Sequence, residues 1–469
     1  MSEPPLTLTE AAAALRAGTV TSVELTEQAI ARADKLDHIL GVYLARFDDY
    51  ALEAAAKADD ELAGGRDRGP LHGVPCAVKD ILAMAEGPTT AQSLILDPAW
   101  GAGRDAPVVT RLKQAGAVIL GKTSTCEFAL GVPDPEKPFP FPRNPWNTGT
   151  WPGGSSSGSG AGVAAGLFYM AVGTDTGGSI RIPAGFCGVS GLMPTFGRVP
   201  KSGCVPLGYT QDHIGPLARS AADCAAALEV MAGLHASDPD CVDAPFTAGP
   251  RPAGLAGLRI GVVTENQFSE RSDPALRPAL EAATAVLAAS GATVREVRLP
   301  YWNEMNTVNI MMIMAEALAY HRNDLATRWD DYFAATRFMV AQGALVSGAD
   351  YVQAQRVRRV AMQAIGDLFA EVDLVVSPTL GAGAVSYDTL GHGGGSGMNG
   401  LVGLINTGYW DCLGNPVLAL PIGFTGDGLP LSMQVAAPAF GEEAALRAGQ
   451  VYQQHTSWHL QQPAVAGAR

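Results

Sequence analysis

Two serine clusters embedded in glycine have the clearest potential for chemistry in this chain. The first lies in Pro152–Gly166, PGGSSSGSGAGVAAG, and the second in Gly173–Gly185, GTDTGGSIRIPAG. A serine hydroxyl attacks a carbonyl only when a neighbouring group accepts its proton, and backbone N–H groups of a glycine-rich turn can stabilise the resulting oxyanion. Because the first cluster runs into an apolar segment that must be buried, it is unlike a Gly/Ser linker, which stays polar. The pattern indicates a site for acyl transfer.

Two glycine motifs of nucleotide-binding proteins can be tested against the first cluster. Gly160-x-Gly162-x-x-Ala165 fits a dinucleotide fingerprint loosely. That fingerprint needs a preceding strand, which the stretch 147–152 cannot supply. A P-loop is excluded because no Gly-Lys-Ser/Thr follows these glycines. We therefore expect no nucleotide cofactor.

A third motif, Gly154-x-Ser156-x-Gly158, matches the nucleophile elbow of Ser-His-Asp hydrolases. In that alternative Ser156 attacks, and His455 or His459 serves as the base. The two histidines show H-x-x-x-H spacing but lack the glutamate and third ligand of a zinc site, so no metal is expected. Two histidines on one face of a C-terminal helix are the simpler interpretation. The elbow also needs a strand directly upstream, and the residues before Gly154 do not form a strand pattern. This disfavours a Ser-His-Asp esterase but leaves it as an alternative.

The motifs as a set resemble the amidase signature family. PGGSSSGS is followed by DTGGSIRIPAG, with Ser179 placed 24 residues after Ser155, and both are preceded by GVPCAVKD at 73–80. Further similarities are Gly121-Lys122-Thr123, Arg143-Asn144-Pro145-Trp146, and the region from Gly414-Asn415-Pro416 to Gly428-Leu429-Pro430. The resemblance covers nearly the whole chain. It departs at Ser157, where the family usually has glycine.

This resemblance implies a catalytic triad of Ser179, Ser155 and Lys79. Ser179 would be the nucleophile, Ser155 a bridging serine after a cis peptide bond, and Lys79 the base. A hydroxyl both donates and accepts, so Ser155 can relay the proton. Lys79 can accept it only when neutral, which requires burial to lower its pKa by about three pH units from about 10.4. Asp80 opposes this unless its carboxylate points elsewhere.

The turn that contains Ser179 predicts an oxyanion hole. Consecutive N–H groups of Thr176, Gly177 and Gly178 can converge on one oxygen. Supporting roles are expected for Gly154, which eases the backbone path into Ser155, and for Asp175 and Arg181, which flank the turn and hold its shape.

The signature does not choose among amides, esters and carbamates or urethanes. Tyr301–Leu318, YWNEMNTVNIMMIMAEAL, is either a core-facing helix or an adaptable apolar wall. With the Gly391–Gly400 loop and the candidate pocket residues Cys126, Phe128 and Met305, it favours hydrophobic or aryl substrates, as in aryl acylamidase or urethanase-like members. Fold and triad set the reaction class, whereas specificity lies in loops.

Glutamine-dependent amidotransferase subunits share the signature and need a partner. They also carry an S-R-Y-D-G-type stretch that binds glutamine, which the comparable region here, Leu325–Tyr332, lacks. A stand-alone hydrolase is preferred, with the partner-dependent amidotransferase kept as the alternative.

Short apolar runs that alternate with helical patterns predict an α/β fold, with a large mixed, mostly parallel sheet covered by helices on both faces. Strands are expected at 74–78, 118–120, 168–173, 258–263, 292–297, 374–376, 417–422 and 431–435. Helices are expected at the N-terminus behind two capping boxes, and at 108–114, 159–167, 274–290 and 351–369. We expect one amidase domain over 1–469, with N-terminal helices at 6–60, a signature core at about 70–235, and a variable pocket region at about 300–370.

Bulk properties restrict the partners. A net charge of −14 without a basic run disfavours nucleic acid and anionic membrane, and no stretch of 18 uninterrupted apolar residues occurs. Seven scattered cysteines without a C-x-x-C pair favour reduced thiols and a cytoplasmic protein. The expected partner is a small-molecule amide, ester or carbamate, and a homodimer is left open.

Overall fold

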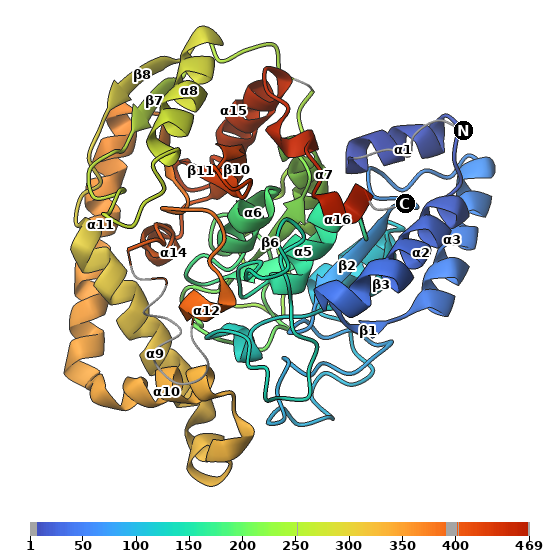
Figure 1. The fold of residues 1–469 in the computed structure, drawn as a ribbon, viewed down its shortest axis with the longest axis horizontal. Helices are drawn as coiled ribbons and strands as arrows, with labels where there is room; N and C mark the ends of the chain where they lie inside the picture. The colour runs from blue at the N-terminus through green and yellow to red at the C-terminus, as the bar shows by residue number, and fades with distance from the viewer. Residues whose placement is uncertain (1–6, 251, 391–400, 402, 468–469) are drawn as a thin grey trace.

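The computed structural model describes residues 7–250, 252–390, 401 and 403–467. The segment Gly391–Gly400, expected above to lie near the pocket, is outside these described residues. Within them, eleven strands form one sheet in the order β1-β3-β2-β4-β6-β5-β10-β11-β9-β7-β8 (Figure 1). The strands are β1 Tyr43–Arg46, β2 Pro75–Lys79, β3 Val118–Thr123, β4 Met170–Asp175, β5 Ser190–Met193, β6 His213–Ala218, β7 Arg259–Val262, β8 Thr293–Glu296, β9 Leu374–Pro378, β10 Val417–Phe424 and β11 Pro430–Ala436.

Helices connect and cover these strands. The α-helices are α1 Leu8–Arg16, α2 Ser22–Leu40, α3 Asp48–Ala63, α4 Pro107–Gln114, α5 Ser157–Ala165, α6 Arg181–Cys187, α7 Ala221–Met231, α8 Leu276–Ala289, α9 Trp302–Thr327, α10 Ala334–Gln342, α11 Gly348–Glu371, α12 Tyr387–Leu390, α14 Gly408–Leu413, α15 Glu442–Gln454 and α16 Ala464–Gly467. Short 3₁₀ turns are η1 Glu127–Ala129, η2 Trp329–Asp331, η3 Gly343–Leu345 and η4 Trp458–Leu460.

The two N-terminal helix starts are confirmed. Thr7 accepts a hydrogen bond from the Glu10 N–H, and the Glu10 carboxylate accepts from the Thr7 N–H, which satisfies two otherwise unbonded donors. Thr21 and Glu24 form the same reciprocal pair at the start of α2. Gly18 follows α1 with a φ of +64°, the left-handed conformation in which glycine commonly ends a helix.

The sheet is mixed, as predicted, but it is not mostly parallel. Four of the ten strand pairings are parallel and six are antiparallel. Four of the six antiparallel pairings involve β1, β5 or β6, which the sequence pattern did not reveal. The other two involve β11, which follows β10 through a turn too short for a parallel crossover.

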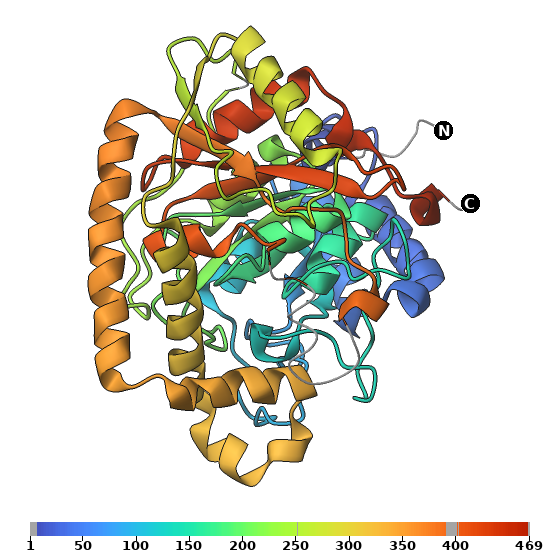
Figure 2. The ribbon, with the colours of Figure 1, turned by 60° about the vertical axis from the view of Figure 1, so that its left-hand side comes forward.

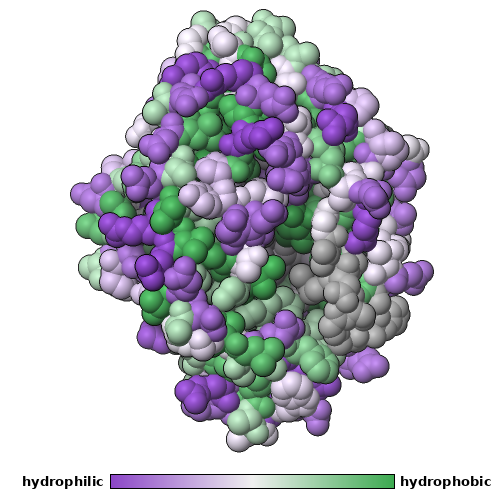
Figure 3. All heavy atoms as spheres, turned by 90° about the vertical axis from the view of Figure 1, so that its left-hand side faces the viewer, coloured by the Kyte–Doolittle hydropathy of each residue, from purple (hydrophilic) through white to green (hydrophobic). Residues whose placement is uncertain are grey.

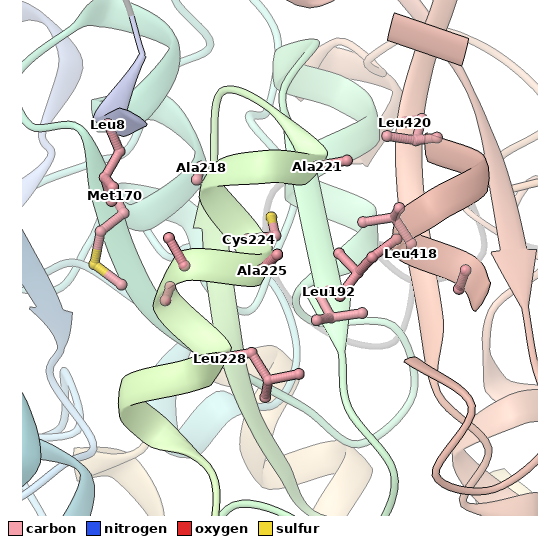
Figure 4. Packing of buried hydrophobic residues seen from close by; sticks show 14 of the residues in the cluster. Leu8, Met170, Leu192, Ala218, Ala221, Cys224, Ala225, Leu228, Leu418 and Leu420 are labelled. Atoms are coloured by element: carbon pink, nitrogen blue, oxygen red, sulfur yellow. The ribbon is translucent and has the colours of Figure 1, made fainter. Parts of the chain in front are cut away.

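Helices cover both faces of the sheet, which confirms the predicted layers. Helices α1, α4, α7, α8 and α15 pack on one face, and α2, α3, α5 and α6 pack on the other. On the first face, Figure 4 shows Cys224, Ala225 and Leu228 of α7 between Met170 on one side and Leu192 and Leu418 on the other. Lys79, at the end of β2, therefore lies in a sheet whose two faces are both shielded from water.

A third group of helices, α9, α11 and α14, packs against side chains of β5, β9, β10 and β11. In Figures 1 and 2, α9 and α11 run side by side along one edge of the molecule. They carry exposed apolar side chains such as Ile310, Val352 and Val360, and Figure 3 shows hydrophobic and hydrophilic side chains interspersed on this face. No helix in the described ranges is long and apolar enough to cross a membrane.

Helix α5 is made of small residues because it is packed closely on all sides. Every residue from Ser157 to Ala165 is buried. A Cβ added at Gly158 would lie 2.7 Å from both the backbone nitrogen and the hydroxyl of Ser124, so the backbone of β3's continuation would have to move. The sequence composition of this helix is therefore set by the distance between backbones.

We expect Gly158→Ala to lower the free energy of unfolding by about 2 kcal/mol or more, because a methyl group would press on backbone atoms that cannot move aside. Gly366→Ala is the matched control. Gly366 lies exposed in α11 with nothing within 4 Å of an added Cβ, so alanine there should stabilise by about 0.5–1 kcal/mol. Urea unfolding of both variants measures the difference, and equal effects would contradict the packing argument.

Candidate active site

Lys79 ends β2 deep inside the protein, with two hydroxyl groups as partners. Its Nζ lies 2.7 Å from Ser155 Oγ and 2.7 Å from Thr174 Oγ1. All three side chains are buried, and Lys79 is 0% exposed. Among the described residues, Lys79 forms no ion pair. Burial lowers the pKa of Lys79 to about 8, so about a tenth of this amine is neutral at pH 7, far more than for an ordinary lysine.

Ser155 lies in the loop that leads into α5. The peptide bond between Gly154 and Ser155 is cis, as the resemblance implied. The Ser155 carbonyl accepts a hydrogen bond from the Cys126 N–H at 3.1 Å. A Cβ at Gly154 would lie 2.6 Å from the Trp151 ring and 2.7 Å from Cys126 Sγ, so only glycine fits there. The close contacts explain why glycine is required at 154, and its supporting role in the site stays a prediction.

Ser179 lies in the turn between β4 and α6. It is half-buried, whereas Ser155, Ser156, Ser157 and Ser159 are buried, so it is the accessible hydroxyl of the two clusters. The carboxylate of Asp175, at the end of β4, accepts from the N–H groups of Gly178 at 2.5 Å and Ile180 at 3.1 Å. The turn is therefore wrapped around one carboxylate.

The carbonyl groups of this turn are all held by protein donors. Asn309 of α9 donates to the Thr176 carbonyl at 3.0 Å, and Thr407 donates to the Gly177 carbonyl at 2.6 Å. The Gly178 carbonyl accepts from Ile182, and the Ser179 carbonyl accepts from Ser156. Since each trans peptide plane points its N–H opposite to its carbonyl, these bonds fix where the N–H groups point.

Accounting for the turn's N–H groups changes one prediction. The N–H of Gly178 is bonded to Asp175, so it is not free to hold an oxyanion in this state. The N–H groups of Gly177 and Ser179 have no acceptor among residues 7–250, 252–390, 401 and 403–467. The sequence pointed to Thr176, Gly177 and Gly178; the same accounting leaves Thr176 and Gly177 as candidates and puts Ser179 in place of Gly178. Gly178 instead supplies a φ of +128° and leaves room for Thr407.

Asp175 and Arg181 form part of a buried charge cluster that supports the turn. Arg181 Nε lies 2.9 Å from Asp175, and its Nη2 lies 2.5 Å from Asp411 of α14. Although burial alone would raise it, the charge and hydrogen bonds of Arg181 lower the pKa of Asp175 to about 2. Burial raises the pKa of Asp411 well above its ordinary range. The predicted shape-holding role of Asp175 and Arg181 agrees with these contacts.

The arrangement around Ser156 does not match the nucleophile elbow. Residues 151–156 form no strand. The Ser156 hydroxyl is fully buried and makes 3.3 Å contacts with the backbone N–H and carbonyl of Thr174. His455 ends α15 and His459 lies in η4, so the two histidines are not on one helix, contrary to the simpler interpretation above. Within the described ranges, neither histidine is hydrogen-bonded to Ser156.

The three candidate pocket residues lie in different parts of the structure. Phe128 is buried in a cluster with Ile81, Ile313 and Tyr332, and its ring packs edge-on against His321 at 4.3 Å. Cys126 lies behind the Gly154–Ser155 bond, as described. Met305 is 0% exposed and packs with Tyr409 and Trp410 in the α9–α11–α14 core, so the structure does not bring it to the site. The side chains of α9 that reach the turn are Asn309 and Ile313.

Four residues of the site escaped sequence analysis: Thr174, Asn309, Thr407 and Asp411. Thr174 is five residues before Ser179 and one residue past the predicted strand 168–173, but it lies within the observed β4, so extending that strand by two residues would have found it. The other three come from distant segments whose contact with the turn no local pattern encodes.

Comparison with known proteins gives the family. A family model described as Amidase matches residues 24–446. An amidase of Pseudomonas putida is 40% identical over an alignment of 471 residues that covers 99% of this chain and 98% of that protein. A glutamyl-tRNA(Gln) amidotransferase subunit of Methylococcus capsulatus is 38% identical over 484 residues, 98% of each chain. A bacterial aryl acylamidase of the amidase signature enzymes has a solved structure with a TM-score of 0.87 at 25% identity, over 99% of this chain and 98% of that one. The chain therefore belongs to the amidase family.

Proposed function

We propose that this family member is a stand-alone hydrolase that cleaves a hydrophobic or aryl amide through an acyl-Ser179 intermediate. The observation that carries the proposal is a buried lysine without a carboxylate partner in the described chain, hydrogen-bonded to Ser155. The residue after Ser155, Ser156, donates its N–H to the carbonyl of the half-buried Ser179 at 3.2 Å, which brings the two clusters together. An ester or carbamate would follow the same path, since the attacked atom is a carbonyl carbon in each case.

In the proposed mechanism Ser179 Oγ attacks the substrate carbonyl and gives its proton to Ser155. Ser155 passes its own proton to neutral Lys79, which later protonates the leaving amine by the reverse route. The oxyanion is held by the N–H groups of Gly177 and Ser179, with Thr176 as a further candidate. Water then attacks the ester at Ser179 and releases the acid.

The substrate proposal rests on the walls near the site. The cluster that contains Phe128 and Ile313 is formed by apolar side chains that include Ile81 after β2, residues of η1 and α9, and Tyr332 after η2. Burial lowers the pKa of His321 to about 4, which keeps it neutral. Such a wall suits an apolar acyl or aryl group. A cytoplasmic site of action agrees with the scattered cysteines of the sequence. The similarity to amidotransferase subunits keeps a partner-dependent glutaminase as the outcome that the first experiment must exclude.

The first experiment measures hydrolysis of a hydrophobic 4-nitroanilide, a matching aryl carbamate and glutamine by the purified chain alone. We expect turnover of the anilide, with Ser179→Ala and Lys79→Ala each lowering kcat by at least about a thousandfold, because the nucleophile or its base is gone. Ser156→Ala should keep most of the activity. If Ser156→Ala is inactive while Lys79→Ala is not, the elbow mechanism is correct. If the chain leaves the anilide and the carbamate intact and hydrolyses only glutamine, the amidotransferase alternative is correct.

The pH dependence of kcat/KM tests Lys79 as the base. Because only the neutral amine accepts a proton, kcat/KM should rise with pH to a plateau with an apparent pKa of about 8, and should fall about tenfold for each pH unit well below it. Initial rates between about pH 5.5 and about pH 9.5 give the profile. A flat profile across the neutral to mildly alkaline range would contradict a base with this pKa.

Asn309→Ala tests the geometry of the proposed oxyanion hole. Without the donor to the Thr176 carbonyl, the Gly177 N–H loses its fixed direction, and we expect kcat to fall by about tenfold or more with little change in KM. Asn303→Ala is the control, since Asn303 lies exposed on the same helix. Equal kinetics for the two variants, measured on the anilide, would show that Asn309 does not position the turn.

A further inference from the structure

Asp80 follows Lys79 directly in the chain, yet its carboxylate is paired with a different lysine. Asp80 Oδ1 lies 2.7 Å from Lys122 Nζ, and both side chains are buried, with 1% and 0% exposed. The other carboxylate oxygen accepts from the backbone N–H and the hydroxyl of Thr90. Lys122 Nζ also donates to the Pro88 carbonyl at 3.0 Å and to Thr89 Oγ1 at 2.6 Å. The ion pair is fully enclosed and well hydrogen-bonded.

Strand geometry separates this pair from Lys79. Lys79 is opposite Thr123 in the β2–β3 ladder, and Thr123 Oγ1 lies 2.9 Å from Ser159 Oγ of α5. Successive strand residues point to opposite faces, so Lys79 lies on the α5 face and Asp80 continues toward the other. A register shift between the pairs Cys76–Ile119 and Val78–Lys122 adds one residue to β3 and turns Lys122 to the Asp80 face.

The other charged or titratable groups that face Lys79 are already held. They are Asp175, bonded to Arg181; Asp212, bonded to the Thr176 hydroxyl and to the N–H groups of Leu207 and Gly208; and the thiols of Cys126 and Cys204. Burial raises the pKa of both thiols, so they stay neutral. Asp80 is the remaining carboxylate to consider, because it follows Lys79 directly in the chain.

We propose that Lys122 is a positioning residue for Lys79: its ion pair with Asp80 holds that carboxylate on the opposite face of β2 and compensates its charge, which leaves Lys79 without a counterion. The inference rests on the proposed role of Lys79 as the base and adds a second lysine that decides when this base is neutral. Lys122 acts through Asp80 and does not touch the substrate.

Changing either partner should shift the protonation of Lys79, with opposite signs. Lys122→Met leaves the Asp80 charge uncompensated beside Lys79, which favours the ammonium form. Asp80→Asn leaves the Lys122 charge uncompensated, which favours the neutral amine. The double variant Lys122→Met/Asp80→Asn removes both charges, and the two effects should cancel because the residues are in contact.

The experiment is the pH profile of kcat/KM for these three variants, for Lys122→Arg and for the wild type. We expect the apparent pKa near 8 to rise by about one pH unit in Lys122→Met, to fall in Asp80→Asn, and to return to the wild-type value in the double variant and in Lys122→Arg. Lys113→Met is the control: it breaks another ion pair, a partly exposed one with Glu86 and Asp105, and should not move the profile.

Lower activity with an unmoved apparent pKa in both single variants would overturn the proposal and leave Lys122 a purely structural role. If Lys122→Met does not fold, Asp80→Asn with an unmoved pKa overturns it equally, and a lowered pKa supports it. Failure of the proposed function is distinguishable, because it would show as activity in Lys79→Ala or as a wild-type profile without a group near pH 8.

Discussion

Lys79 ends a central strand with two hydroxyls as partners and, in the described chain, no carboxylate, and the rest of the site is arranged around that condition. An ammonium group in this position loses most of its hydration, so burial shifts the protonation equilibrium of Lys79 toward the neutral amine. The burial of Lys79 depends on the structural layers that surround β2. Parallel neighbours on both sides of β2, small residues in α5 and buried side chains on the opposite face exclude water at once. A serine next to such an amine gains a proton acceptor that a surface lysine would not provide.

The turn around Ser179 solves a second problem, which is to keep N–H groups directed at a reacting oxygen without a helix to orient them. Asp175 binds the N–H groups on one side, and donors from α9 and from the residue before α14 bind the carbonyls on the other. Arg181 connects the carboxylate to Asp411, so the turn is joined to the far part of the chain through one buried guanidinium. Buried charges of this kind are costly unless every hydrogen bond is made, and here nearly all are.

Local sequence patterns predicted what local physics determines. Both capping boxes and the eight predicted strands are present in the structure, whereas the supporting roles of Gly154, Asp175 and Arg181 stay predictions. The strands that were missed, β1, β5 and β6, are short or lie between glycines and prolines, and their pairing partners are distant in the chain. For that reason the expectation of a mostly parallel sheet was wrong.

The same limit applies to the site. Lys79 and Ser155 could be named from their motifs, and their hydrogen bond follows from the fold. The engagement of the Gly178 N–H by Asp175 depends on turn geometry, and the place of Met305 in the core depends on which face of α9 meets α14. Residue type and spacing along the chain predict neither of these two features. Sequence identifies which groups can react, whereas tertiary contacts decide which backbone atoms remain free to assist them.

One contact links the part of the chain expected to vary with substrate to the part that reacts. Asn309 lies in the middle of α9, among residues that were expected to shape a pocket, and yet it holds the Thr176 carbonyl and is bonded to Gln211. A chimaera that received α9 from a relative would therefore change the support of the Ser179 turn as well as the side chains near the substrate. Unless the donor helix brought an amide to the same place, the exchange would loosen the turn, and an apparent loss of specificity would in fact be a loss of alignment.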